Sequence, residues 1–418
     1  MKSSKISGFY KLTPEERLKI VKEYCDLDDQ DSEAISSMHG LKMEQADHMI
    51  ENVIGGITLP VGIAVNFLIN GKDYLIPMAI EEPSVVAAAS NAAGMTREKG
   101  GFTTTQMESI MIGQIQVLNV KDPQAARTSV LESRDKILEL ANSQDKRLLS
   151  LGGGAKDLNV KVLETITGSQ VIVELFVDCK DAMGANAVNT MSEAVAPLIE
   201  SLTNGKVLLK IISNLATKRL AKARAVFSKE AIGGEEIVDG IVHAYAFAQA
   251  DPYRASTHNK GIMNGISAVA LACGQDTRAI EAGAHSYANK DGRYSSLTTW
   301  EKDANGDLVG SIEIPMAVGL VGGSTASHPV AKACRKILGV SSASEMGSVI
   351  ACVGLAQNLA ALRALASEGI QKGHMKLHAR NIAVAAGASG DLVEKVASKL
   401  VEENNIRVER ARELVQSI

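Results

Sequence analysis

Two adjacent carboxylates, Glu81 and Glu82, open an apolar segment that continues through Pro83-Ser84 into a run of Val and Ala. Acidic side chains in the first turn of a helix interact favourably with the helix dipole, which explains such a pair without any chemistry. A carboxylate held against an apolar wall instead has a raised pKa and can act as a general acid. The spacing leaves both interpretations open.

A second group of polar residues lies between residues 251 and 265. Its two cations, Arg254 and Lys260, fall with His258 and Asn264 within eleven positions, 254–264. Arg and Lys are the side chains that bind carboxylates and phosphates in proteins. The segment is therefore expected to be a loop, either an ordinary polar surface loop or one that binds an anionic substrate.

Two further residues have the chemistry for proton transfer. Asp276 stands in the turn Gly274-Gln275-Asp276, where an aspartate ordinarily serves the turn itself. His374 lies in Gly373-His374-Met375, before the charged C-terminal segment. A lone histidine is most often structural or exposed, but one beside a mobile segment can deliver a proton once that segment closes.

The segment Asp181-Ala182-Met183-Gly184-Ala185-Asn186 joins a β-branched run, 170–179, to a helical pattern. A turn of small residues leading into a helix N-terminus suits a pyrophosphate, because the free N–H groups there face the anion. The turn has one glycine where Gly-x-Gly-x-x-Gly has three, so a Rossmann site is excluded. No His or Cys spacing typical of a zinc site occurs, and no metal is expected.

The composition indicates what kind of protein positions these residues. The chain has 418 residues, of which 45% are hydrophobic, so it can bury an ample core. Its net charge is −4 and only 3% of its residues are aromatic, whereas a nucleic-acid-binding protein needs a basic face and stacking aromatics. Alanine and glycine together supply 90 residues, which favours close packing and sites built from main chain. No nucleic-acid partner is expected.

The order of the predicted elements indicates an α+β protein. A capping box with Pro at the first helical position, Thr13-Pro14-Glu15-Glu16, opens the first helix, and Ala-rich, helix-like sequence continues to about residue 108. Helical patterns return after residue 215. Between them the pattern is β-α-β-β-α-β, the order of a ferredoxin-like unit, with strands at 111–120, 157–166, 170–179 and 206–213 and helices at 122–149 and 186–202.

We therefore expect a large, mainly helical domain with a smaller domain inserted into it. The large domain comprises residues 1–108 and 215–369, and the inserted ferredoxin-like domain comprises residues 109–214. Residues 370–418 form a C-terminal helical flap, in which Gly387-Ala388-Ser389-Gly390 predicts a helix break or hinge.

The cysteines and the uncharged stretches bear on cellular location. The N-terminus, Met1 to Lys11, has no apolar core of signal-peptide length. The stretches 314–331 and 346–362 contain glycine or polar residues, so neither is expected to span a membrane. The five cysteines are scattered without a Cys-x-x-Cys pair, which is typical of reduced thiols. We expect a cytoplasmic protein with no membrane partner.

Five motifs occur in order along the chain and carry a resemblance to a known family. They are Glu51-Asn52-Val53-Ile54-Gly55, Pro77-Met78-Ala79-Ile80-Glu81-Glu82-Pro83-Ser84, Asp181-Ala182-Met183-Gly184-Ala185-Asn186, His258-Asn259-Lys260-Gly261 and Gly373-His374-Met375. With them the chain resembles the 3-hydroxy-3-methylglutaryl-CoA (HMG-CoA) reductases. The resemblance is specifically to class II, in which two of these motifs read Glu-Glu-Pro-Ser and Asn-Lys-Gly-Ile-Met-Asn-Gly. The resemblance runs from about residue 8 to the C-terminus.

The resemblance implies an oxidoreductase that interconverts HMG-CoA and mevalonate plus coenzyme A by two hydride transfers with NAD(H). The family's catalytic acid, lysine, aspartate and flap histidine fall here on Glu82, Lys260, Asp276 and His374. The aspartate would lie beside the lysine and couple it to the acid. The positions that hold the hydroxymethylglutaryl group fall on Ser84, Arg254 and Asn264.

The resemblance also implies contacts with the cofactor and with coenzyme A. Asp145 matches the position that faces the adenosine ribose, where a carboxylate accepts hydrogen bonds from the hydroxyls and repels a 2′-phosphate. NAD(H) is thus expected over NADP(H), unless Asp145 is only a surface helix residue. In the CoA site, some relatives carry an Arg where this chain has Tyr10-Lys11, and Lys11 would serve there as a point charge.

Assembly is implied by the same resemblance. Glu51, Asn52 and Gly55 belong to the motif of the family's dimer interface, where active sites form between subunits. The implied assembly is a homodimer, with three dimers forming a hexamer. Its ligands would be HMG-CoA, mevalonate and coenzyme A.

Two other functions fit the same residues. One is an NAD-linked oxidoreductase of another acyl-CoA or hydroxy acid, because the residue set suits hydride transfer in general. The other is a non-catalytic CoA-binding protein of the same fold, against which the complete catalytic set argues. The sequence leaves open whether mevalonate is made for isoprenoid biosynthesis or degraded.

Overall fold

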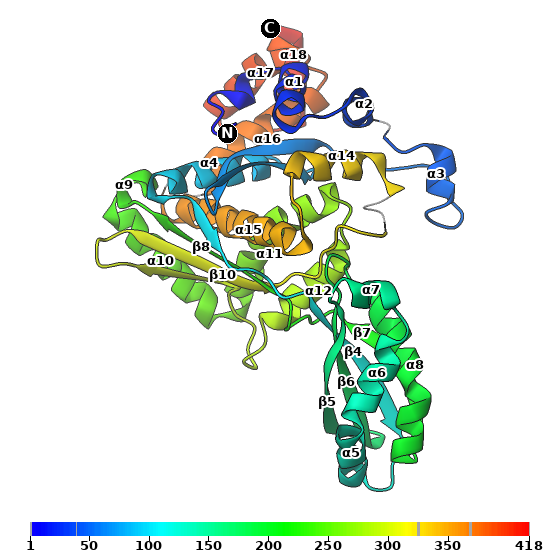
Figure 1. Ribbon diagram of the computed structural model, residues 1–418. Helices are drawn as coiled ribbons and strands as arrows, with labels where there is room; N and C mark the ends of the chain where they lie inside the picture. Colours follow the sequence, from blue (N-terminus) through cyan, green and yellow to red (C-terminus); the bar gives the residue numbers. More distant parts are fainter. Residues whose placement is uncertain (1, 39, 324–326, 368–369, 418) are drawn as a thin grey trace.

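A sheet of six strands lies at the centre of the larger part of the molecule (Figure 1). The computed structural model describes residues 2–38, 40–323, 327–367 and 370–417, and of residues 370–377 it describes the backbone only. The strand order is β2-β1-β3-β8-β10-β9, antiparallel except between β1 and β3. The strands are β1 (Val61–Ile69), β2 (Lys72–Ala79), β3 (Phe102–Thr104), β8 (Leu220–Phe227), β9 (Thr298–Lys302) and β10 (Leu308–Pro315).

These six strands occupy segments for which the sequence pattern favoured helix, so that part of the prediction is wrong. Strand β8 shows why. Ala221, Ala223 and Ala225 are buried, while Lys222 and Arg224 between them are exposed. Alanine is a good helix former, but burial at every second residue is the period of a strand. The mixed α and β character of the fold is confirmed.

Helices pack on this sheet and complete its core. Helix α15 (Ala343–Ala366) is long and apolar enough to cross a membrane, with a mean hydropathy of 1.6, but 67% of that stretch is buried inside the protein. It packs against α4, α11 and β8 as a core helix. The other helices of this part are α4 (Val85–Thr96), η2 (Arg97–Lys99), α9 (Lys229–Ile232), α10 (Glu235–Ala250), α11 (Pro252–Ala272), α12 (Thr277–Tyr287) and α14 (Pro329–Leu338).

A second sheet of four antiparallel strands forms a separate unit (Figure 1). Its strand order is β5-β6-β4-β7, which is the order of a ferredoxin-like unit, and three helices pack on it around a core of its own. The elements are β4 (Ile110–Leu118), α5 (Pro123–Glu132), α6 (Arg134–Asn142), α7 (Lys146–Ser150), β5 (Gly154–Thr165), β6 (Gly168–Asp178), α8 (Ala185–Thr203) and β7 (Lys206–Ser213).

The predicted single helix over 122–149 is in fact three helices. Asp122 caps the first by accepting the N–H groups of Gln124 and Ala125. The chain leaves helical geometry at Ser133, and Asp145 then caps α7. A side chain that caps a new helix N-terminus competes with continuation of the old one, which a purely apolar period does not reveal.

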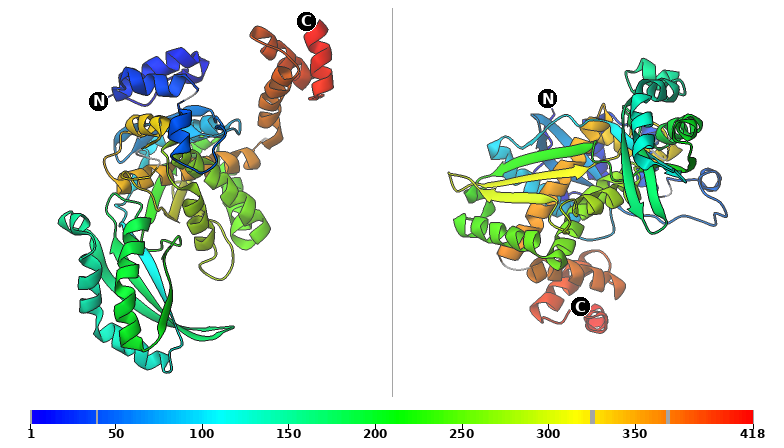
Figure 2. Two further views of the ribbon diagram at one scale, coloured as in Figure 1. Left: turned by 90° about the vertical axis from the view of Figure 1, so that its right-hand side faces the viewer. Right: turned by 90° about the horizontal axis from the view of Figure 1, so that it is seen from below.

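The two ends of the chain form the remaining helices. The N-terminal ones are η1 (Phe9–Lys11), α1 (Pro14–Cys25), α2 (Asp29–Ser36) and α3 (Met43–Asp47), and the predicted capping box of α1 is present. The last three, α16 (Ile370–Ala385), α17 (Asp391–Glu402) and α18 (Val408–Ser417), pack around their own apolar cluster away from the four-stranded sheet (Figure 2). The predicted break lies between α16 and α17.

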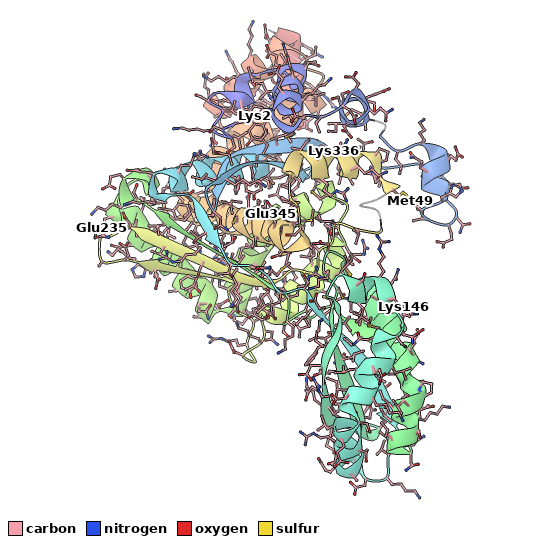
Figure 3. The ribbon with its side chains drawn as sticks, in the orientation of Figure 1. Lys2, Met49, Lys146, Glu235, Lys336 and Glu345 are labelled. Carbon is pink, nitrogen blue, oxygen red and sulfur yellow. The ribbon has the colours of Figure 1, made fainter. Side chains whose placement is uncertain are left out.

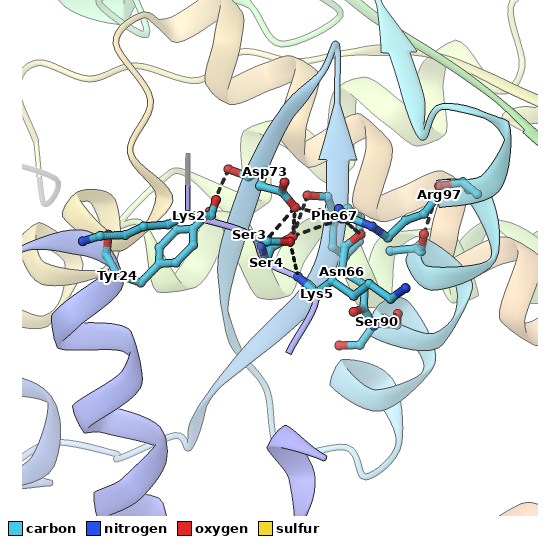
Figure 4. A network of polar contacts seen from close by, with 12 residues as sticks. Lys2, Ser3, Ser4, Lys5, Tyr24, Asn66, Phe67, Asp73, Ser90 and Arg97 are labelled. Atoms are coloured by element: carbon cyan, nitrogen blue, oxygen red, sulfur yellow. Dashed lines mark hydrogen bonds and ion pairs between the residues drawn. The ribbon is translucent and has the colours of Figure 1, made fainter. Parts of the chain in front are cut away.

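A polar network fixes the N-terminal segment to the β1–β2 hairpin (Figure 4). Ser4 is fully buried, and its hydroxyl oxygen lies 3.0 Å from the Phe67 carbonyl oxygen and 2.5 Å from Oδ1 of Asp73. Arg97 Nη1 donates to the same Asp73 oxygen at 2.8 Å and to the Asn66 carbonyl at 3.0 Å. One carboxylate thus joins the first residues, a hairpin and η2.

Replacing Asp73 by asparagine is expected to lower the free energy of unfolding by about 1–3 kcal/mol at pH 7. Burial alone would raise the pKa of Asp73, but hydrogen bonds from Arg97 and Ser4 outweigh it and hold that pKa below its ordinary value of 3.8. The stabilisation is therefore present above that pH and is lost as the pH falls below it.

Urea unfolding of wild type and variant at pH 7 and pH 3 measures this difference. The gap in unfolding free energy should be smaller at pH 3 than at pH 7, because the stabilisation is lost as the pH falls from 3.8 through the lowered pKa of Asp73. Asp29→Asn is the control, because Asp29 pairs with Lys22 on the surface and its side chain is 96% exposed. A gap that is the same at both pH values would contradict the assigned network.

Candidate active site

Glu82 and Lys260, two of the four predicted catalytic residues, form an ion pair. Nζ of Lys260 lies 2.8 Å from Oε2 of Glu82, and the Asn264 amide donates to Oε1 of the same carboxylate at 3.3 Å. The side chain of Lys260 is 62% exposed and that of Glu82 36% exposed, so a ligand can reach both. Polar donors thus contact both oxygens of the Glu82 carboxylate.

The cation-rich segment is part of one helix, α11, and the expectation of a loop is wrong. Asp251 caps the helix by accepting the N–H of Arg254 at 2.9 Å, and Pro252 occupies the first helical position. Lys260 and Asn264 are four residues apart and therefore share a face. The buried side of the helix was hard to recognise because it includes His258 as well as apolar residues.

Buried polar contacts fix the helix next to Lys260. His258 Nε2 lies 2.9 Å from Oγ1 of Thr298, and Oδ1 of Asn259 accepts the Leu297 N–H at 3.0 Å. Burial, with a smaller effect of the Arg254 charge, lowers the pKa of His258 to about 3. This histidine is therefore neutral at physiological pH, so it positions the helix and does not serve as a proton donor.

Ser84 and Arg254, both predicted to bind substrate, keep polar groups available. Ser84 caps α4 with φ +76°, a strained conformation for a residue with a side chain, and its hydroxyl makes no capping bond. Arg254 is partly buried, and no acceptor contacts its guanidinium within the described residues. Burial lowers the pKa of Arg254. Strain and an unpaired cation are both typical of positions that wait for a ligand.

A cavity of about 1450 Å³ lies beside the N-terminus of α8 and brings most of the predicted cofactor residues together. Its walls include residues 182–187, the 144–147 segment, the turn at Asp276 and residues 56–59. Such a volume exceeds that of ordinary small-molecule pockets and is sufficient for a dinucleotide. Neither Glu82 nor Lys260 lines this cavity in the single chain.

The predicted turn before α8 has the geometry expected of it. Gly184 caps the helix with φ +108°, and a Cβ there would lie 2.4 Å from the Cys179 sulfur, so only glycine fits. The four N-terminal N–H groups of any helix lack partners within the helix, which leaves those of α8 beside the cavity. Asp181 differs from expectation, because its carboxylate accepts the Ala343 N–H at 2.8 Å and it does not line the cavity.

Asp145 is the N-cap of α7 and lines the cavity. One carboxylate oxygen accepts the Leu148 N–H at 2.8 Å. Gln144 and Arg147 line the cavity beside it. Asp145 is therefore more than a surface helix residue: it combines a structural role with access to the cavity.

Within one chain, Asp276 does not lie beside Lys260, the residue next to which the resemblance places it in a site formed between subunits. It caps α12 by accepting the Ala279 N–H at 3.0 Å and pairs with Arg278 at 3.1 Å. The turn is tied to Ala270, whose carbonyl accepts the Gln275 N–H at 2.8 Å. Ten residues of helix separate that point from Lys260, which is about 15 Å along the axis. Within this chain the Asp276 turn is therefore held away from the Lys260–Glu82 pair.

His374 and the CoA-site residues complete the predicted set. His374 lies in α16 but falls among residues 370–377, whose side chains are outside the described part of the structure. Tyr10 is exposed, and Nζ of Lys11 lies 5.8 Å above its ring. Lys11 is thus an exposed cation on the N-terminal segment.

Arg219 and Gln275 are site residues that the sequence reasoning missed. Gln275 makes two bonds to Gly319, accepting its N–H at 2.8 Å and donating to its carbonyl at 2.9 Å, and so ties the Asp276 turn to the cavity wall. Arg219 binds the carbonyls of the turn before α8. In the sequence, Arg219 follows Lys218 among other cations, and nothing distinguishes it from a surface residue.

Residues 48–60, here called the arm, project from the body beside α3 and carry the predicted dimer motif (Figure 1; Met49 is labelled in Figure 3). Glu51, Asn52 and Gly55 are all exposed, and Ile54 and Ile57 are 97% and 95% exposed. Isoleucines that contact almost nothing within their own chain are typical of an interaction surface.

Comparison with known proteins identifies the family. Residues 13–379 match the model of hydroxymethylglutaryl-coenzyme A reductase. A 3-hydroxy-3-methylglutaryl-coenzyme A reductase of Archaeoglobus fulgidus is 62% identical over 416 residues, which covers 100% of this chain and 95% of that protein. A probable reductase of the same name from Borreliella burgdorferi is 40% identical over 340 residues, covering 80% of this chain and 77% of that protein.

Solved structures agree with these sequence matches. The reductase of Streptococcus pneumoniae superposes with a TM-score of 0.85 at 40% identity, covering 98% of this chain and 99% of that one. A class II reductase structure from the same organism, bound to NADPH in open conformations, gives a TM-score of 0.84 at 41% identity, covering 86% of this chain and 99% of that chain. The chain therefore belongs to the hydroxymethylglutaryl-coenzyme A reductase family, in its class II form, and is an oxidoreductase of the mevalonate pathway.

Proposed function

We propose that this chain reduces HMG-CoA to mevalonate and coenzyme A, and runs the reverse reaction, with Glu82 and Lys260 at the reacting carbon. The observation that supports this assignment most directly is the contact of 2.8 Å between Nζ of Lys260 and Oε2 of Glu82 on an exposed surface. Bound nicotinamide dinucleotide would supply the hydride in each of two reductions, one of the thioester and one of the aldehyde.

The roles of the side chains follow from the charges that this chemistry creates. Each hydride transfer leaves negative charge on the former carbonyl oxygen, which the Lys260 ammonium can stabilise. Glu82, hydrogen-bonded to that lysine, can exchange a proton with the same oxygen. The departing CoA thiolate needs a proton, which we assign to His374 on the flap. Ser84, Arg254 and Asn264 would bind the hydroxymethylglutaryl carboxylate and hydroxyl.

The active site requires two chains. The Asp276 turn is bonded to Ala270, which lies about 15 Å along α11 from Lys260, yet the proposed chemistry needs Asp276 beside that lysine. The arm carries exposed Ile54 and Ile57, whose burial by a second chain would remove apolar surface from water. We propose a homodimer that places Asp276 of one chain at the Lys260–Glu82 pair of the other, with three dimers in a hexamer, working in the cytoplasm.

The cofactor would bind in the 1450 Å³ cavity, with the turn at 182–186 on its pyrophosphate and Asp145 on the adenosine ribose. The N-terminal N–H groups of α8 and the small residues of the turn fit such a dianion. The Asp145 carboxylate would repel a 2′-phosphate, so NAD(H) is the proposed cofactor, with NADP(H) second.

Replacing Asp145 by asparagine is expected to lower the preference for NADH over NADPH by about tenfold, measured as the ratio of the two kcat/KM values. Asparagine can keep the cap on α7 but loses the charge. Arg147→Ala is the matched control, because Arg147 lines the same cavity with the opposite charge and its loss should disfavour NADPH. An unchanged ratio in Asp145→Asn would remove this residue from cofactor selection.

One assay tests the proposed reaction. Purified chain is incubated with HMG-CoA and NADH, and in reverse with mevalonate, coenzyme A and NAD, while absorbance at 340 nm is followed. Two NADH are expected to be oxidised per HMG-CoA consumed. No change in absorbance with either NADH or NADPH would refute the proposal, and turnover of other acyl-CoA substrates at a higher rate would assign a different substrate.

A further inference from the structure

Arg219 is a fully buried cation to which the reaction described above gives no role. It stands in the connection between β7 and β8, where the chain returns from the four-stranded to the six-stranded sheet. Its own backbone is fixed: its N–H donates to Ala216 at 2.9 Å, and its carbonyl accepts the Met316 N–H at 2.9 Å. The backbone of Arg219 is therefore fixed in position by hydrogen bonds on both sides.

The guanidinium contacts main-chain carbonyls and, among the described residues, no carboxylate. Nη1 donates to the carbonyls of Ala182 and Met183 at 3.0 and 3.1 Å, and Nη2 donates to that of Val318 at 2.6 Å. Nε is buried and has no acceptor in the same part of the chain. Burial lowers the pKa of Arg219, but an arginine stays protonated in proteins. The group is thus a buried positive charge with no counter-ion in contact.

The acidic side chains around Arg219 are engaged elsewhere. Asp178 pairs with Lys180 at 2.9 Å, and Asp181 accepts the Ala343 N–H at 2.8 Å. Both act on the guanidinium only through space. A buried charge without a contacting partner is unfavourable unless something else balances it. An anion bound on the far side of the turn would do so.

The bonded carbonyls belong to the turn that leads into α8. In a trans peptide the C=O and the following N–H point in opposite directions, so the N–H groups of Met183 and Gly184 point away from Arg219. The turn and the first residues of α8, 182–187, line the 1450 Å³ cavity. Arg219 thus holds the turn from behind while the other side of the turn faces the cavity.

We propose that Arg219 is a positioning residue for the dinucleotide: it fixes the shape of the 182–184 turn, and its charge is neutralised by the pyrophosphate bound in front of that turn. This inference rests on the proposed cofactor site. It assigns part of the cofactor affinity to a residue that does not touch the cofactor.

Arg219→Met and Arg219→Lys test the inference in the full-length chain. The dissociation constant for NADH is measured at 50 and 300 mM KCl, together with that for HMG-CoA and the thermal midpoint. The methionine variant is expected to bind NADH about tenfold more weakly at low salt and to lose much of the salt dependence, with HMG-CoA affinity unchanged. The lysine variant keeps the charge, so it should keep the salt dependence.

Arg363→Met is the matched control, because Arg363 also donates to a main-chain carbonyl, that of Ile232 at 2.7 Å, away from the cavity. It should leave NADH binding unchanged. NADH binding within twofold of wild type in folded Arg219→Met, or an equal loss in Arg363→Met, would overturn the inference. If the methionine variant does not fold, loss of salt dependence in Arg219→Lys overturns it. Wild type that binds neither NADH nor NADPH would instead refute the proposed cofactor site.

Discussion

Replacing Lys260 by alanine is expected to lower turnover about a hundredfold to a thousandfold, equivalent to about 2.7–4 kcal/mol of transition-state stabilisation. The reason is that Nζ of Lys260 is the cation hydrogen-bonded to Glu82, and no other cation contacts that carboxylate among the described residues. The rate is measured at saturating HMG-CoA and cofactor, so that weaker binding does not contribute.

The stability of the Lys260→Ala variant should change little. The side chain of Lys260 is 62% exposed, and pairs with such exposure contribute at most about 1 kcal/mol to folding. Lys222→Ala is the control, since Lys222 also pairs with a glutamate, Glu313, at 2.6 Å, but outside the proposed site. Turnover retained in Lys260→Ala would exclude this lysine from the mechanism, and an equal loss in Lys222→Ala would show a general effect.

Co-expression of two inactive variants, Lys260→Ala and Asp276→Ala, is expected to restore about a quarter of wild-type activity. Each variant alone is expected to be inactive, because catalysis requires both Lys260 and Asp276. In a mixed dimer with shared sites, one site receives both damaged residues and the other receives both intact ones. Half of the randomly formed dimers are mixed, and half of their sites are intact.

The matched control is co-expression of Lys260→Ala with Glu82→Ala. These two side chains contact each other within one chain at 2.8 Å, so every site of the mixed dimer lacks one of them and no activity should return. The co-expressed chains are purified together, without separating mixed from unmixed dimers, and assayed at 340 nm. No recovery in the Lys260→Ala and Asp276→Ala pair would contradict the two-chain site.

Local signals allowed parts of the fold and site to be predicted from sequence. The capping box at Thr13 and the turn into α8 depend on residues close together in the chain. Strand β8 was missed because its alternate alanines resemble helix sequence until a neighbouring sheet supplies the reason for the alternation. The assignment of Glu82 and Lys260 to one site, in turn, required a resemblance to a family, since 178 positions separate the two.

The separation of Asp276 from Lys260 and the burial of Arg219 were not predictable in the same way. The first depends on α11 being one continuous helix of 21 residues, whereas the polar residues of that segment indicated a loop. The second depends on three carbonyls supplied by chain segments that are 36 to 99 positions away. The sequences around Asp276 and Arg219 contain no pattern that predicts either geometry.

The distribution of the two cores along the chain has a consequence for synthesis on the ribosome. All but one of the buried residues around the four-stranded sheet come from one continuous stretch, Met111 to Ala216. The core of the six-stranded sheet begins at Ala64 and ends at Leu362, and it includes the apolar α15. The unit around the four-stranded sheet can therefore form its core while the ribosome is still synthesising the rest of the chain. The core around the six-stranded sheet, by contrast, cannot cover β1 and β2 until α15 has emerged from the ribosome. The apolar surface of these strands is therefore most exposed to aggregation while the residues between β2 and α15 are being synthesised.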